Sequence, residues 1–143
     1  MTFLLDVSVL IALIDRTHVH HPSAVDWFDS LGQDLWATCP ITENGLVRIL
    51  GSRRYRNSPG NPAIVGKLLN ELVALPGHVF WADDVSLRDS TKFDFSRLQT
   101  ASQVTDSYLL ALAQAHGGKL ATLDQKLIVN AVIGGAECVE VIR

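Results

Sequence analysis

Short apolar runs alternate with longer segments of helical periodicity along most of the chain, and this alternation constrains the fold more than any other feature. Apolar runs of about four to eight residues bounded by turn residues are typical of buried strands, whereas the intervening segments repeat their apolar residues at helical spacing. Strands and helices that alternate in this way form a parallel sheet covered by helices. We therefore predict an α/β fold around a mostly parallel central sheet.

The positions of the elements follow from the same pattern and from capping residues. We expect strands at residues 2–5, 34–39, 78–82, 119–123 and 137–141. We expect helices at residues 8–15, 21–32, 40–50, 63–75 and 102–118, the first capped by Ser8 and the last by Ser102. A short helix is expected to begin at Asp83, followed by a loop or lid over residues 90–102. No linker or repeat interrupts the pattern, so residues 1–143 are taken as one domain.

The composition predicts a soluble, cytoplasmic protein. Hydrophobic residues make up 48% of the chain, but no apolar run reaches the roughly 18 residues that a membrane span needs. The amino terminus lacks the basic segment and cleavage site of an export signal. Cys39 and Cys138 stand in apolar contexts without metal-ligand spacing, as reduced core thiols do. The net charge of -3 excludes a surface that is basic throughout.

Four of the 15 acidic residues differ from the others in their setting. Asp6 and Asp124 each follow an expected strand, where open α/β sheets place their sites. Glu43 begins an apolar helical stripe, and Asp106 lies in the first turn of a helix that is apolar nearly all round. Two strand ends and two helix starts can meet at one edge of a parallel sheet. We therefore expect these four carboxylates to converge.

Converging carboxylates need a cation. Two of them about 4 Å apart repel by roughly 4 kcal/mol at an effective dielectric constant of about 20. Oxygen ligands favour Mg²⁺ or Mn²⁺, and Mg²⁺ accepts few protein carboxylates because it keeps several of its waters. We expect Mg²⁺ as the cofactor, with Mn²⁺ as a substitute. Taken singly, each acid could instead cap a helix or a turn.

The segments around these acids resemble the PIN-domain ribonucleases and, among them, the VapC toxins of bacterial toxin–antitoxin pairs. The matching segments are LLDVSVLIAL with Asp6, ITENGLVRI with Glu43, and VTDSYLLALAQAHGGKLATLD with Asp106 and Asp124. The resemblance covers almost the whole chain and implies a three-layer α/β/α fold and Mg²⁺-dependent endoribonuclease activity. It also implies a homodimer that a small cognate antitoxin inhibits. In this family the residues matching Asp6, Glu43 and Asp106 hold metal, with the one matching Asp124 close by. Leu127, where relatives often carry an aromatic residue, departs from the pattern in packing only.

The expected chemistry is attack on an RNA phosphodiester by water that a metal activates, with the four acids as catalytic residues. Ser8 and Thr122 are candidate hydrogen-bond donors to these carboxylates, although both hydroxyls also suit capping or strand packing. Positive charge for RNA gathers in the segment RILGSRRYR, which suits phosphate contact and base stacking or, equally, a solvated loop. The candidate RNA-binding residues are Arg48, Arg53, Arg54, Tyr55 and Arg56. A second rim could come from Lys92, Phe93, Phe95 and Arg97.

Two further clusters of metal-binding residue types have weaker support. His18, His20 and His21 precede a helix without an acidic or cysteine partner at a recognised ligand spacing. Asp83 and Asp84 suit a turn and a helix cap better than a metal pair.

Other functions are also less consistent with the sequence. Phosphatases that use an Asp after the first strand usually have a second Asp two residues later, where Ser8 stands, and no glycine-rich nucleotide-binding motif is present. The main alternative is an RNA-binding module that kept the PIN fold without catalysis. Such a module would lack one or more acids, whereas this chain keeps all four.

Overall fold

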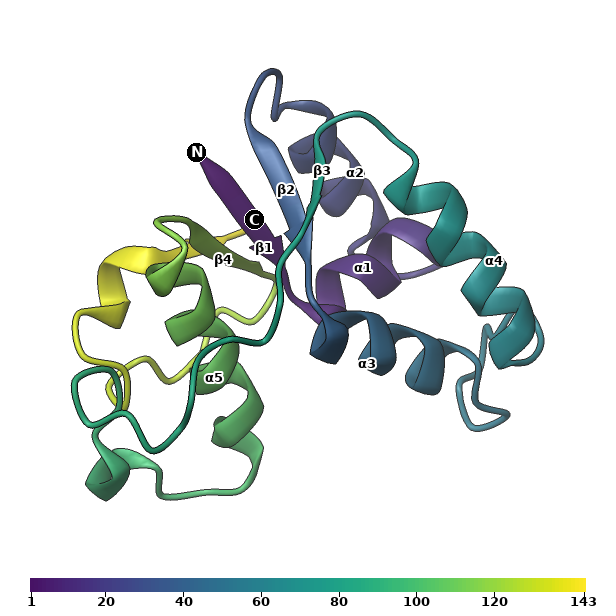
Figure 1. The fold of residues 1–143 in the computed structure, drawn as a ribbon. Coiled ribbons are helices and arrows are strands. Elements are labelled where there is room, and N and C mark those ends of the chain that lie inside the picture. Colours follow the sequence, from purple (N-terminus) through teal and green to yellow (C-terminus); the bar gives the residue numbers. More distant parts are fainter.

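A five-stranded sheet forms the centre of the structure, a computed structural model that describes residues 1–143 (Figure 1). All neighbouring strands are parallel, in the order β3-β2-β1-β4-β5. The strands are β1 (Thr2–Leu5), β2 (Leu35–Thr38), β3 (His78–Phe80), β4 (Lys119–Thr122) and β5 (Val139–Val141). The predicted parallel sheet is confirmed, and each strand lies within its expected range.

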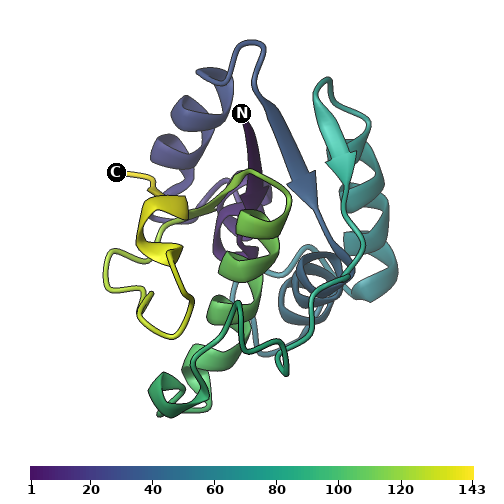
Figure 2. The same ribbon diagram turned by 60° about the vertical axis from the view of Figure 1, so that its left-hand side comes forward.

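Helices cover both faces of the sheet and complete the three α/β/α layers (Figures 1 and 2). They are α1 (Val7–Ile14), α2 (His21–Asp29), α3 (Pro40–Leu50), α4 (Pro62–Val73) and α5 (Ser102–Ala115). Helices α1 to α4 pack together on one side of the sheet, and α5 packs on β1 and β4 from the other side. Two short 3₁₀ turns, Phe95–Arg97 and Gly135–Cys138, lie on the α5 side.

The central strands β2, β1 and β4 are mostly apolar because both of their faces are largely buried. Successive side chains of a strand point to opposite faces of the sheet. Leu4 and Leu120 accordingly belong to the core cluster that contains α5, whereas Phe3, Leu5 and Trp36 belong to the cluster on the α1–α4 side. The central strand β1 is therefore fixed from both sides, and so is the position of the residue that follows it.

The starts of two helices differ from the sequence prediction. Asp6 caps α1, because its carboxylate accepts a hydrogen bond of 2.8 Å from the N–H of Val7, and Ser8 lies inside the helix. Ala101 precedes α5 without a side-chain cap, so Ser102 is the first residue of that helix instead of its cap. In the first case an acid already stands one position after the end of β1, where it reaches the free N–H groups directly.

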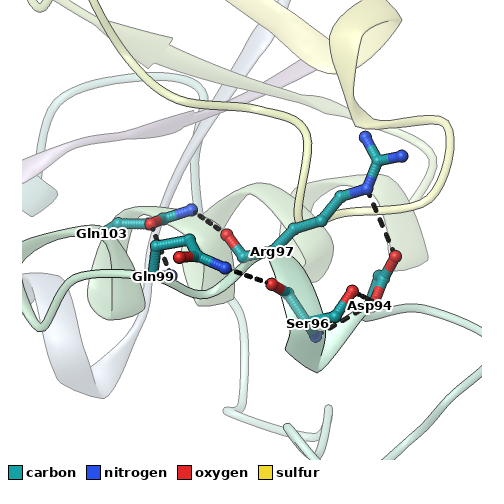
Figure 3. Close-up of polar contacts among 5 residues, drawn as sticks. All are labelled: Asp94, Ser96, Arg97, Gln99 and Gln103. Atoms are coloured by element: carbon teal, nitrogen blue, oxygen red, sulfur yellow. Dashed lines mark hydrogen bonds and ion pairs between the residues drawn. The ribbon is translucent and has the colours of Figure 1, made fainter.

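Residues 90–102 form a loop that is held together by its own polar contacts (Figure 3). Asp94 accepts a hydrogen bond from the N–H of Ser96 (3.0 Å) and forms an ion pair with Nε of Arg97 (3.3 Å). The side chain of Gln103, in α5, donates to the carbonyl of Arg97 (2.8 Å) and accepts from the N–H of Gln99 (3.0 Å). The start of α5 is thus tied to the loop that precedes it.

Phe93 does not lie on an exposed rim, as the sequence interpretation had it. Its side chain is 3% exposed and packs in the α5-side core, while its backbone pairs with Val132. The prediction was wrong for this residue. The loop sequence has no periodicity that marks a buried position, and burial of the aromatic ring in the core is favourable. Phe95 nearby is exposed.

The two cysteines are unpaired, with Cys39 buried and Cys138 partly buried. None of the helices has the length and apolar character required to cross a membrane.

Candidate active site

The carboxyl ends of β1 and β4 form the centre of the candidate site. These two strands are neighbours although most of the chain separates them, and the N–H of Asp6 donates to the carbonyl of Ala121 (3.0 Å). The direction in which the chain winds reverses between β1 and β4, and open α/β sheets bind ligands at such a point. Asp6 directly follows β1, and Asp124 follows β4 after one intervening residue.

Asp6 is held in place by three hydrogen bonds. Its Oδ1 accepts from the N–H of Val7 (2.8 Å), and its Oδ2 accepts from the hydroxyls of Thr122 (2.9 Å) and Ser8 (3.4 Å). Burial raises the pKa of Asp6, since only 9% of the residue is exposed, and these hydrogen bonds oppose the rise. The charge of Asp124 raises it further. The Thr122 hydroxyl also accepts from the N–H of Asp124 (3.1 Å) and so connects the two acids.

Asp106 is the fifth residue of α5, one position further into the helix than expected, and reaches the same site. Burial raises its pKa to about 6, and the charges of Asp6 and Asp124 add to the increase. The pKa of an isolated, solvated Asp is about 3.9. The structure therefore brings Asp6, Asp106 and Asp124 close enough for their charges to repel one another.

A cavity of about 440 Å³, here called the acidic cavity, opens beside Asp6 and Asp106. The start of α1, one face of α3 and the segment after β3 form its other walls, and Arg48 contributes a positive charge. Asp83 also lines it, and the Oδ1 atom of Asp83 is buried without a hydrogen-bond partner. No helix follows Asp83, so the predicted short helix is wrong. The neighbouring Asp84 instead contacts His116 (3.1 Å).

The sequence interpretation passed over Asp83, although a signal was present. Asp83 follows β3 at the same edge of the sheet as Asp6 and Asp124, so the strand-end argument that selected those two residues applies to it as well.

Glu43 does not line the acidic cavity. Its Oε2 accepts a hydrogen bond from the hydroxyl of Thr38 (2.8 Å), and that hydroxyl lies 2.8 Å from Nε2 of His78. Burial lowers the pKa of His78, and the charge of Glu43 partly opposes this effect. Glu43 shares the core-facing stripe of α3 with Leu46, as expected. Glu43 therefore contacts the carboxyl end of β2, whereas the cavity is lined by the face of α3 that contains Gly45.

The donor atoms suit a hydrated magnesium ion. No three His, Cys, Asp or Glu side chains lie close enough together to form a metal site by themselves. Mg²⁺ commonly binds through one or two carboxylates and keeps several waters, so it needs no such group of three. Asp6 and Asp106 supply two carboxylates on one cavity, and a divalent cation would offset the burial and the charge repulsion that raise their pKa values.

A second cavity, of about 330 Å³ and here called the arginine cavity, adjoins the first. It is lined by Arg48, Ile49, Ser52, Arg54 and Tyr55, and Arg48 and Ile49 also line the acidic cavity. Arg53 and Arg56 are exposed on the same loop but line neither cavity.

Tyr55 anchors this arginine-rich loop to α1. Its hydroxyl donates to Oδ2 of Asp15 (2.5 Å), and Asn57 donates to the same oxygen (3.5 Å). Burial and the neighbouring carboxylate raise the pKa of Tyr55 to about 12. The half-buried ring packs against the apolar core on the α1–α4 side, so Tyr55 fixes the loop that carries the arginines.

A third cavity, of about 220 Å³ and here called the lysine cavity, lies on the other side of Asp106. Its lining residues include Gln103, Asp106, Asp124 and Lys126. The N–H of Lys126 donates to Oδ1 of Asp124 (2.9 Å). Asp106 therefore separates two cavities and lines both of them.

The three histidines before α2 make local contacts only. His18 Nδ1 accepts from the N–H of His20 (3.0 Å), and Nδ1 of His21 lies 2.6 Å from the carbonyl of Ala12. These contacts fix the turn into α2 and form no group with an acid.

The comparisons with known proteins agree with this architecture. The model of the PIN domain family matches residues 3–132. Two Mycobacterium tuberculosis proteins, ribonuclease VapC44 and ribonuclease VapC39, are 45% and 44% identical to the chain over 137 residues, covering 96% of this chain and 96% and 99% of their own. Ribonuclease VapC38 from the same species is 41% identical over 121 residues, covering 85% of this chain and 84% of its own. The fold, the family match and these identities together place the chain in the PIN domain family.

Proposed function

We propose that this protein is a Mg²⁺-dependent endoribonuclease of the VapC type that hydrolyses RNA phosphodiester bonds. The observation that carries the proposal is the group of three mutually repelling carboxylates, Asp6, Asp106 and Asp124, at the point where β1 and β4 end. The relatives that cover most of the chain are named ribonucleases, which supports the same activity.

Asp6 and Asp106 are the residues that would hold the metal, with Asp124 beside them. When bound, a divalent cation lowers the pKa of coordinated water and offsets the charge that develops on a phosphate. Mn²⁺ is expected to substitute for Mg²⁺, because both ions favour oxygen ligands. The family pattern also assigns Glu43 to this set. The hydroxyl of Thr38 holds one of its two carboxylate oxygens, Oε2.

The chain itself orients these carboxylates and prepares the site for a polyanion. The hydroxyls of Thr122 and Ser8 and the N–H of Val7 fix both oxygens of Asp6. Arg48, on the wall of the acidic cavity, supplies positive charge for a phosphate. Arg54 extends this charge into the arginine cavity.

The other basic residues of the loop have a supporting role in the proposal. Arg53 and Arg56 are exposed and available to phosphates further along the RNA. Tyr55 holds the loop through Asp15 and offers the exposed part of its ring to a base.

Cleavage assays with conservative variants test the activity. The purified protein, freed of any partner, should cleave RNA in Mg²⁺ and lose this activity in chelator. Asp6→Asn and Asp106→Asn should reduce the cleavage rate at least 100-fold, whereas Glu71→Gln, an acid-to-amide change on the exposed side of α4, should leave it unchanged. Glu43→Gln measures what Glu43 contributes.

Equal cleavage by Asp106→Asn and the parent protein would refute the proposed function. RNA binding without cleavage by the parent in Mg²⁺ would favour the alternative of a non-catalytic RNA-binding module.

We propose further that a small cognate antitoxin inhibits the protein in the cytoplasm, that the active form is a homodimer and that residues 1–143 act as one domain. The similarity to VapC proteins supports this assignment. Expression of the chain alone should arrest growth, and co-expression of a neighbouring small open reading frame should restore it. Normal growth on expression of active protein would refute the toxin assignment, and a monomeric mass in solution would refute the dimer.

A further inference from the structure

We propose that one single strand of RNA crosses the site from the arginine cavity over Asp106 to the lysine cavity, and that Lys126 binds a phosphate on the side of the cut opposite to Arg54. This inference rests on the proposed function and adds a substrate path and a specific contact to it.

The three cavities adjoin one another in a row. The arginine cavity and the acidic cavity share Arg48 and Ile49, and the acidic cavity and the lysine cavity share Asp106. Cavities that share a lining residue adjoin one another. A chain molecule can therefore pass through all three, with the acids near its middle.

The charges along this row of cavities follow an order that suits a polyanion. Four acids, Asp6, Asp83, Asp106 and Asp124, line the acidic and lysine cavities and would repel phosphates on both sides of the cut, so cations are needed to offset this repulsion. Arg48 and Arg54 supply positive charge at one end, and Lys126 supplies it at the other. None of these three side chains forms an ion pair in the structure, where Arg97 is the one Lys or Arg side chain that does.

A backbone hydrogen bond positions Lys126 so that its side chain can bind a phosphate. The turn after β4 is closed by the bond from the N–H of Lys126 to Asp124, so the backbone of Lys126 keeps a fixed place beside the acids. Its side chain is exposed. A mononucleotide or an inorganic phosphate would fill one cavity, whereas the positive charges lie in the first and the last of three adjoining cavities. The arrangement therefore fits a single strand better than a small phosphate ligand.

Binding measurements in a cleavage-deficient background test the inference. The cut in a model RNA is first mapped with the parent protein, and the affinity of the Asp6→Asn protein for a labelled oligonucleotide around the cut is then followed by fluorescence anisotropy against salt concentration. Log affinity falls with log salt concentration. For a single strand, the loss of one neutralised phosphate makes this negative slope less steep by about 0.7. Adding either Lys126→Gln or Arg54→Gln should make the slope less steep by that amount. The matched control, Lys67→Gln on the exposed side of α4, should not.

Neutral methylphosphonate linkages then test the direction of the path. A neutral linkage on one side of the cut should abolish the effect of Lys126→Gln, and one on the other side should abolish the effect of Arg54→Gln. Disappearance of both effects on the same side would overturn the inference, and so would a Lys126→Gln protein with the salt slope of the control. The inference would also be overturned if the two substitutions weakened the binding of a mononucleotide as much as that of the oligonucleotide. If the parent protein does not cleave RNA, the proposed function fails first. Normal cleavage without these effects refutes only the path.

Discussion

Asp106→Asn should stabilise the metal-free protein at neutral pH, and this gain should disappear on acidification. The pKa of Asp106 is about 6 in the folded protein, because burial and the charges of Asp6 and Asp124 disfavour the ionised form. In the unfolded chain the group has its ordinary value of 3.8. The folded state therefore binds the proton more tightly, and the stability of the parent protein falls as the pH rises from about 4 to about 6.

The size of the effect follows from the same difference. One pH unit corresponds to 1.36 kcal/mol, so a difference of about two units corresponds to roughly 3 kcal/mol when it is fully expressed. Water screens a half-buried carboxylate, so we expect about 1–2 kcal/mol. Above pH 6 the parent protein bears the whole cost, and below about pH 4 it bears none. Asparagine has nearly the same shape and does not ionise, so it avoids this cost at every pH.

Urea unfolding in chelator at pH 7.5, 6 and 4.5 measures the difference. The advantage of Asp106→Asn over the parent should be largest at pH 7.5 and should fall to about a third of that value at pH 4.5. Glu71→Gln, the control on α4, should show no comparable trend. An advantage that does not change with pH, or one that grows as the pH falls, would refute the argument that repulsion and burial strain this carboxylate.

Three further predictions concern the metal, the arginine-rich loop and the packing of β4. Saturating Mg²⁺ or Mn²⁺ should raise the melting temperature of the parent protein, because a ligand that binds only the folded state stabilises it, and calorimetry should show no such increase for Asp106→Asn; an equal increase in both proteins would contradict the assignment. Tyr55→Phe should lower the free energy of unfolding by about 1–3 kcal/mol in urea titrations, because the carboxylate of Asp15 loses a donor; an unchanged value would show that the loop needs no anchor. Gly118→Ala should destabilise the protein more than Gly117→Ala, because a Cβ at Gly118 would collide with the backbone oxygen of Thr2 in β1. A Cβ at Gly117 would meet open space, and the strain there would come only from its positive φ of 69°. Thermal melts that rank these two variants the other way would refute this packing argument.

The sequence predicted the sheet and three of the converging acids because these depend on local rules. The central strands are mostly apolar on both faces, so their positions can be read from the chain, and the residues after β1 and β4 must then lie at one edge of the sheet. Asp106 was found because it interrupts an apolar helix near its start. The three cavities were not predictable, since they depend on how α3, α5 and the loops pack around that edge.

The position of Glu43 shows where reasoning from periodicity ends. The pattern of α3 places Glu43 on the core-facing stripe, and the structure agrees. Which strand end the carboxylate reaches depends on how the helix packs on the sheet, and here it meets Thr38 at the end of β2 instead of Asp6 at the end of β1. Asp83 was passed over for a different reason. A turn and a helix cap already accounted for two adjacent aspartates at this position, so the rule that sites lie at strand ends was not applied to β3.

The central place of β1 in the sheet has a consequence for synthesis of the protein. The ribosome makes Asp6 long before its partners Thr122 and Asp124, since 116 residues separate Asp6 from Thr122. A nascent chain therefore holds only part of the site until β4 has left the exit tunnel and paired with β1. The topology thus couples completion of the site to the synthesis of β4.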